Sequence, residues 1–195
     1  MSTMASDPEE IDLGGDVYVL VGHEGSQIRL KVLSSLLALV SQYFRTLFGS
    51  RFNEGEESAQ GKDITLQDDD AQAFTLLCRI IHMQYALPKQ ALGPDELLSL
   101  AIVADKYGCV QPLTLTLNSI FPAISSIVTF GDACDLASAA YLLDHPMLFQ
   151  QLTHSLIYDH ANSIMEATSA ACGAHIPIHA WCWSQPSRYL ANDLG

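Results

Sequence analysis

The apolar stretch over residues 28–52 constrains the fold of this chain more than any other part of the sequence. Residues 28–33 alternate apolar and polar side chains, which is typical of a half-buried strand. Residues 34–40 are nearly all apolar and predict a buried helix. The next segment begins at Ser41, a good N-cap, and ends at Gly49, a good C-cap, so it predicts a second helix. A stretch this apolar has to lie in a core, and we expect the rest of the chain to cover it.

Composition places the chain among ordinary folded proteins and argues against two classes of partner. The 195 residues are 49% hydrophobic and 16% charged, which suffices for one domain with a smaller appendage. Nine Lys and Arg residues stand against 22 Asp and Glu residues, a formal net charge of −13. Nucleic acids and anionic membranes attract clusters of Lys and Arg, so we expect neither as a direct partner of this acidic chain.

The cysteines and the N-terminal residues indicate an intracellular protein, in the cytoplasm or the nucleus. Five widely spaced cysteines, an odd number, are typical of buried thiols in a reducing compartment. Residues 1–12 are acidic and polar, unlike a secretory signal, and predict a disordered tail. The longest uncharged run contains Pro112 and Pro122 with many Ser and Thr residues, which disfavours a transmembrane helix.

Strand signals dominate the first part of the chain. Residues 16–22 are rich in β-branched side chains, and residues 27–32 form the second strand of a predicted hairpin that turns at Gly25. An exposed acidic loop follows over residues 51–61. Residues 63–67 alternate again and predict a third strand.

Helix signals dominate the remainder. Asp68, Asp69 and Asp70 precede the first of these helices, and helix capping explains them better than a cation site, because no second carboxylate cluster has a matching spacing. That helix is expected to end near Pro88. The helices predicted after it cover residues 93–108, 112–122, 132–144 and 146–160. Only His145 joins the last two, which predicts an antiparallel helical hairpin.

Four motifs, taken in this order, resemble the BTB/POZ domain over roughly residues 16–121. The motifs are residues 16–21 as the opening strand, residues 31–34 with 41–48 as the central serine-aromatic-phenylalanine signature, residues 63–74 as the following strand and helix start, and Ala104-Asp105-Lys106-Tyr107-Gly108 as the alanine-aspartate-lysine-tyrosine ending. The chain is similar to the short stand-alone BTB proteins that are common in fungi, in which a helical extension often follows the domain.

The resemblance implies an α+β fold, in which a small three-stranded sheet is capped by a cluster of about five helices. A C-terminal helical hairpin extends it. The expected organisation is a disordered acidic tail (1–12), the BTB/POZ domain (13–122), the helical extension (131–170) and an irregular tail (171–195).

The resemblance also implies a protein–protein interaction module without a cofactor or enzyme activity, which pairs with itself or with another BTB protein. Family members dimerise through the first strand and first helices, and many bury an Asp and a basic residue there. An ordinary surface ion pair is the alternative for that pair. The dimer-face residues implied for this chain are Asp16, Lys31, Leu36, Leu37, Leu39 and Val40.

Some family members recruit a cullin and act as substrate adaptors for ubiquitin ligases, through a hydrophobic-x-Glu motif after the serine-aromatic helix. Here Phe52-Asn53-Glu54 matches that motif, with Phe52 as a buried anchor and Glu54 as an orienting charge. A loop aromatic packed on its own helix is the alternative. The wider alternative is a scaffold or transcription-regulatory interaction protein that binds no cullin.

A zinc-binding tail is a remote alternative. Cys172, His175, His179 and Cys182 are zinc-ligand types within eleven residues. Structural zinc sites usually separate their two ligand pairs by about 12 residues or more, against three here, so a disordered tail is favoured. An enzyme is disfavoured as well, because the sequence shows neither a Gly-rich phosphate loop nor a nucleophile motif.

Overall fold

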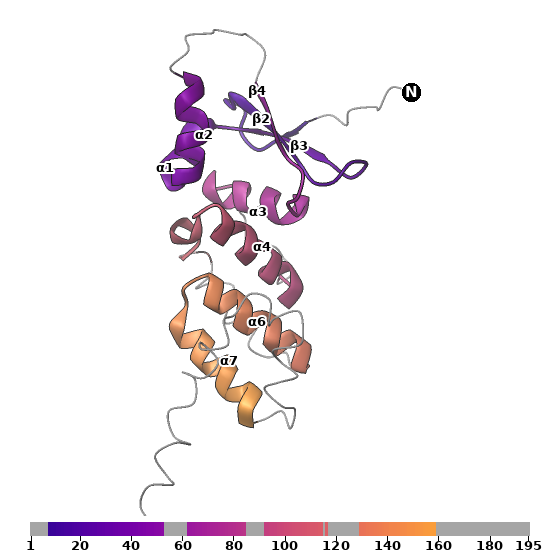
Figure 1. Cartoon of the computed structure of the whole chain (residues 1–195), viewed down its shortest axis with the longest axis vertical. Coiled ribbons are helices and arrows are strands. Elements are labelled where there is room, and N and C mark those ends of the chain that lie inside the picture. The colour runs from indigo at the N-terminus through magenta and orange to yellow at the C-terminus, as the bar shows by residue number, and fades with distance from the viewer. Residues whose placement is uncertain (1–7, 53–61, 85–91, 115, 117–128, 159–195) are drawn as a thin grey trace, which may run out of the picture.

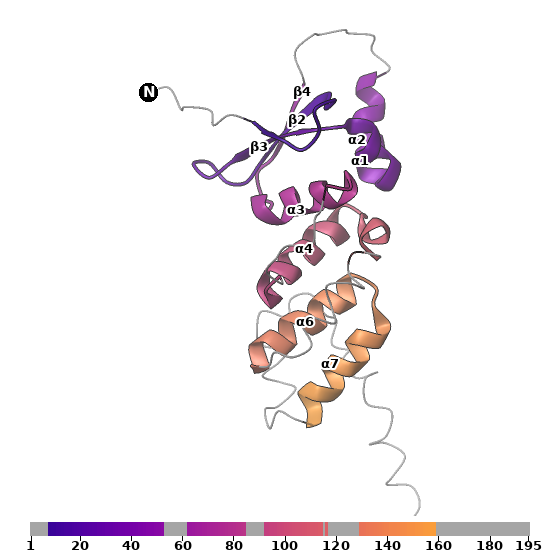
Figure 2. The same cartoon turned by 180° about the vertical axis from the view of Figure 1, so that it is seen from behind.

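The computed structural model describes residues 8–52, 62–84, 92–114, 116 and 129–158. Its elements are β1 (Glu9–Glu10), β2 (Val17–Val21), β3 (Ile28–Val32), α1 (Ser34–Val40), α2 (Gln42–Phe52), β4 (Lys62–Leu66), α3 (Ala71–Ile81), α4 (Pro94–Lys106), α6 (Phe130–Leu142) and α7 (Pro146–Tyr158). Residues 110–114 and 116 are also helical. Figures 1 and 2 show an elongated stack, with the sheet at one end, α1 and α2 beside it, and α3, α4, α6 and α7 following in turn. The α+β class expected from the sequence is confirmed.

The sheet has four strands in the order β1-β3-β2-β4. β2 and β3 form the expected antiparallel hairpin, with Val19 opposite Leu30, and its turn is possible because Gly25 takes φ of +93°. β4 runs parallel to β2 on the other side. Alternate residues of β2 are buried, so one face of the sheet covers the core.

The fourth strand corrects the expectation of a disordered tail over residues 1–12 for residues 9–12, whereas residues 1–7 lie outside the described part of the chain. Glu9 and Glu10 pair in parallel with Leu30 and Lys31, and the next residue, Ile11, is 1% exposed. A strand of two acidic residues carries no periodicity of its own. Its order comes from the exposed edge of β3, which lies about 20 residues further along the chain.

Two predicted helix ends are wrong. The helix from Ser41 does not stop at Gly49, because that glycine has helical backbone angles and α2 continues to Phe52. α3 ends at Ile81 rather than near Pro88, because Met83 takes a left-handed backbone with φ of 55°. The predicted end of the next helix is confirmed, since Gly108 follows α4 with φ of 64°.

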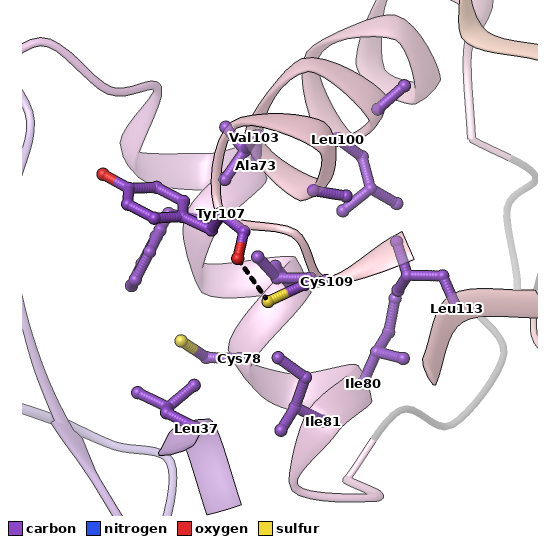
Figure 3. Packing of buried hydrophobic residues seen from close by; sticks show 14 of the residues in the cluster. Leu37, Ala73, Cys78, Ile80, Ile81, Leu100, Val103, Tyr107, Cys109 and Leu113 are labelled. Atoms are coloured by element: carbon purple, nitrogen blue, oxygen red, sulfur yellow. Dashed lines mark hydrogen bonds between the residues drawn. The ribbon is translucent and has the colours of Figure 1, made fainter. Parts of the chain in front are cut away.

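One hydrophobic core connects the sheet with the helices. Buried side chains of α3, α4 and the segment after α4 meet around Cys78, Tyr107 and Cys109, as Figure 3 shows. Leu136 of α6 and Leu143, the C-cap residue of α6, belong to the same core. The helical hairpin of α6 and α7, confirmed as predicted, is therefore packed onto the rest of the chain through α4. Within the described ranges, no helix is long and apolar enough to cross a bilayer.

Candidate interaction surface

Three apolar side chains of α1, those of Leu36, Leu39 and Val40, make up what we call the α1 face. Leu39 is 70% exposed, whereas Leu36 and Val40 are half-buried and pack partly against the core. The spacing i, i+3, i+4 places all three on one side of the helix. α1 contains no charged residue, so its outer side is an uncharged apolar surface.

Leu37 does not belong to that surface, although the resemblance implied it for the dimer face. Its side chain is 0% exposed and lies in the core, near Cys78 and Ile81 in Figure 3. Successive residues of a helix are rotated by about 100°, so Leu37 points away from Leu36 and Leu39 and toward the core. We therefore remove Leu37 from the candidate surface.

Asp16 and Lys31 each have a partner within the chain. The carboxylate of Asp16 accepts hydrogen bonds from the Ser34 backbone N–H at 2.7 Å and from the Ser34 hydroxyl at 2.6 Å. It thereby binds the first turn of α1, where backbone N–H groups lack helical partners. Lys31 Nζ donates to the Leu13 carbonyl at 3.0 Å and lies 3.4 Å from Glu10 Oε1. The two residues are thus not paired with each other in the single chain.

Arg45 fixes the other end of α1. Its guanidinium donates to the carbonyl oxygens of Ala38 at 3.1 Å and Leu39 at 3.3 Å, and to Gln42 Oε1 at 3.1 Å. The last carbonyl groups of a helix have no helical donor, so Arg45 supplies one from α2. This arrangement fixes the corner between α1 and α2, and with it the backbone of Leu39.

His82 joins the end of α3 to the start of α1. Its Nε2 atom accepts from the Leu33 backbone N–H at 3.0 Å, and its Nδ1 lies 2.7 Å from the Cys78 carbonyl. A carbonyl can only accept, so Nδ1 carries the proton and the ring is the neutral Nδ1–H tautomer. Sequence reasoning missed Arg45 and His82. Arg45 could have been predicted, because it is a cation that follows closely after the end of a helix. The hydrogen bond between Leu33 and His82 joins residues 49 positions apart, so no local sequence pattern predicts it.

Behind the surface, Asp69 ties the end of α4 to the start of α3. Its side chain is 5% exposed and accepts from the Tyr107 hydroxyl at 2.5 Å and from Lys106 Nζ at 2.7 Å. Burial raises the pKa of the Tyr107 phenol, and the hydrogen bond to Asp69 and its negative charge raise it further. A raised pKa favours the neutral, donating phenol. Its contribution to stability is therefore complete below the ordinary tyrosine pKa of about 10 and is lost as the pH rises above it.

The thiols that the structure describes are buried, as the sequence predicted for Cys78, Cys109 and Cys134. Burial raises the pKa of the Cys109 thiol from 9.0 to about 11, against a smaller lowering by the Ser41 side chain. Burial also raises the pKa of Cys78, with a further contribution from Cys109. At neutral pH both groups are protonated, and a protonated thiol is a poor nucleophile and metal ligand.

Several predicted site residues lie outside the part of the chain that the structure describes. Phe52 is the last residue of α2, but its side chain is not described. Glu54 lies outside the described residues. So are the four candidate zinc ligands, Cys172, His175, His179 and Cys182. Among the described residues, no group of three or more His, Cys, Asp or Glu side chains is placed to hold a metal ion.

Comparison with known families completes these observations. A family model described as BTB/POZ domain matches residues 12–121, more than half of the 195 residues. The match begins just after β1 and ends after the helical segment that follows α4. No curated protein matches the chain.

Proposed function

The chain belongs to the BTB/POZ domain family, whose members are protein–protein interaction modules, and from this premise we propose that it pairs with a second copy of itself through the α1 face. The observation that carries the proposal is the exposure of Leu39 on an uncharged helix that two other side chains, Asp16 and Arg45, hold in place. BTB proteins are typically intracellular, and we propose the same for this chain.

The chemistry of α1 favours self-association. A two-fold axis would bring the same face of two copies together, so that each Leu39 packs beside Leu36 and Val40 of the other copy. Fully burying a leucine side chain contributes about 1.5–3 kcal/mol, and a symmetric contact gains this twice. The chain carries a net charge of −13, but α1 itself has no charged residue, and the Arg45 guanidinium beside Leu39 is bound by carbonyl groups of α1.

Multi-angle light scattering of the full chain tests this proposal. We expect twice the mass of one chain, and we expect Leu39→Asp to reduce it to the mass of a single chain, because an aspartate would have to lose its hydration inside the contact. Met147→Asp is the matched control, since Met147 is a similarly exposed apolar residue on α7. A Leu39→Asp chain that keeps its circular dichroism spectrum and still has the doubled mass would exclude the α1 face.

We further propose that Phe52 and Glu54 contact a cullin. Support comes from α2, which extends beyond Gly49 and ends at Phe52, so the hydrophobic-x-Glu motif begins directly at a helix end. We expect a cullin N-terminal domain to be captured by the chain in a pull-down, and capture to be lost in Phe52→Ala/Glu54→Ala. Glu56→Ala/Glu57→Ala changes acidic residues that neighbour the motif in the sequence and serves as the control.

The pull-down distinguishes a cullin adaptor from an interaction protein that binds no cullin. Capture that survives Phe52→Ala/Glu54→Ala would show that the motif is assigned wrongly. If the unaltered chain does not capture the cullin, the chain acts as a scaffold or transcription-regulatory interaction protein instead.

A further inference from the structure

The N-terminal strap, which we define as residues 9–13, lies along the edge of β3, and we call the site that it fills the groove. Ile11 and Asp12 both donate backbone hydrogen bonds to the Lys31 carbonyl, at 3.0 and 3.1 Å. The strap thus binds β3 in the way that an added peptide strand binds the edge of a sheet, through main-chain bonds for affinity and side-chain sites for specificity. Glu9 and Glu10 lie before the residues that the family model matches.

The side-chain sites of the groove follow the alternation of a strand. Glu9 forms an ion pair with Arg79 of α3, and Glu10, which points to the other side, pairs with Lys31 at 3.4 Å. Ile11 points to the same side as Glu9 and is buried in the core. The strap therefore places two consecutive carboxylates and then a branched aliphatic side chain along β3. Lys31 and Arg79, which bind these carboxylates, are two of the nine Lys and Arg residues of the chain.

The ion pairs of the strap are weak, so the buried side chain of Ile11 is the main contact that an incoming segment has to replace. Glu10 and Arg79 are each half exposed, and ion pairs at exposed positions contribute little to stability. β1 itself has two residues. Gly14 and Gly15 follow the strap, and a Cβ at Gly15 would lie 2.9 Å from Lys31 Cγ, so glycine is required for the close approach. The same glycines leave the backbone free to adopt other conformations when the strap detaches.

From these contacts we propose that the strap is an autoinhibitory cover. The ligand of the groove is an extended segment of another protein, with two adjacent carboxylates followed by Ile or Val, which adds to β3 as a parallel strand in place of the strap. Charge complementarity with Lys31 and Arg79 selects an acidic partner segment. The strap lies along β3, whereas the α1 face lies on the helix that follows β3, so the two proposed contacts use different side chains.

Peptide binding to the full chain tests the proposal. The probe is a fluorescein-labelled peptide with the sequence of residues 6–13, measured by fluorescence polarisation. Glu9→Lys/Glu10→Lys should release the strap, because it places lysines beside Arg79 and Lys31. A groove that is open in less than a tenth of the molecules has its affinity reduced about tenfold or more, so the opened chain should bind the probe at least about tenfold more tightly than the unaltered chain.

Controls identify the groove as the binding site. In the opened chain, adding Arg79→Glu should abolish binding of the probe, because it removes the cation that pairs with the first glutamate. A probe with two lysines in place of its two glutamates should not bind.

Three results would overturn the proposal. Equal binding to the unaltered and opened chains would show that the strap covers nothing. Absence of binding to both would show that the groove accepts only its own strap. If light scattering shows a doubled mass that the opened chain loses, the occupant is a second copy of this chain rather than another protein.

Discussion

Replacing Phe44 by alanine is expected to lower the free energy of unfolding by about 3–5 kcal/mol. The Phe44 side chain is completely buried, and its ring centroid lies 5.0 Å from that of Tyr107, 5.8 Å from that of Phe48 and 6.2 Å from that of Phe74. These aromatic neighbours are rigid and come from α2, α3 and the end of α4, so they cannot close over the missing ring. Domains unfold at a cost of about 5–15 kcal/mol, so the variant is expected to lose a large fraction of its stability.

Urea denaturation followed by circular dichroism measures this loss. Tyr43→Ala is the control, because Tyr43 precedes Phe44 in α2 and its ring also touches Phe44 and Tyr107, yet it is 47% exposed. We expect a loss of about 1 kcal/mol for Tyr43→Ala, in keeping with the partial burial of its side chain. Equal losses for the two variants would mean that the aromatic cluster does not stabilise the core in the way described.

Elements with their own periodicity were predictable from the sequence, and elements set by distant contacts were not. The hairpin around Gly25 and the pair of helices around His145 carry local signals, and both were confirmed. β1 is too short to have a period, and the early end of α3 depends on a left-handed backbone at Met83 that no glycine announces.

The candidate surface was predictable as a segment but not residue by residue. Residues 34–40 are apolar on nearly every side, so the pattern could not distinguish Leu37, which is buried, from Leu39, which is exposed. The distinction depends on which side of α1 meets α3, and that is a tertiary contact. Asp16 was implied as half of an ion pair, but it binds Ser34, 18 residues further along the chain.

Three consecutive aspartates have three different roles, and Asp69→Ala is expected to have the largest effect, a loss of about 2–3 kcal/mol in the free energy of unfolding. Its removal leaves the Tyr107 hydroxyl, a buried donor, without its acceptor, and removes the partner of Lys106. Asp70 is the N-cap of α3 and accepts from the Ala73 N–H at 2.8 Å, so Asp70→Ala should cost about 1 kcal/mol. Asp68 is exposed, and Asp68→Ala should change stability by less than about 0.5 kcal/mol.

Urea denaturation at neutral pH measures the three losses, and their order is the test. Each variant makes the same change, aspartate to alanine, at one of three adjacent positions. Tyr107→Phe separates the two bonds of Asp69, since it removes the hydroxyl but keeps the ring against Phe44 and leaves Lys106 to bind the carboxylate. We expect it to cost less than Asp69→Ala, because no buried donor is left without an acceptor. It should also reduce the loss of stability above about pH 10, where the unfolded chain releases the Tyr107 proton and the folded chain retains it. Equal costs for Asp68→Ala and Asp69→Ala would mean that the aspartates act only through their charge near the start of α3, and that the tie between α3 and α4 contributes nothing.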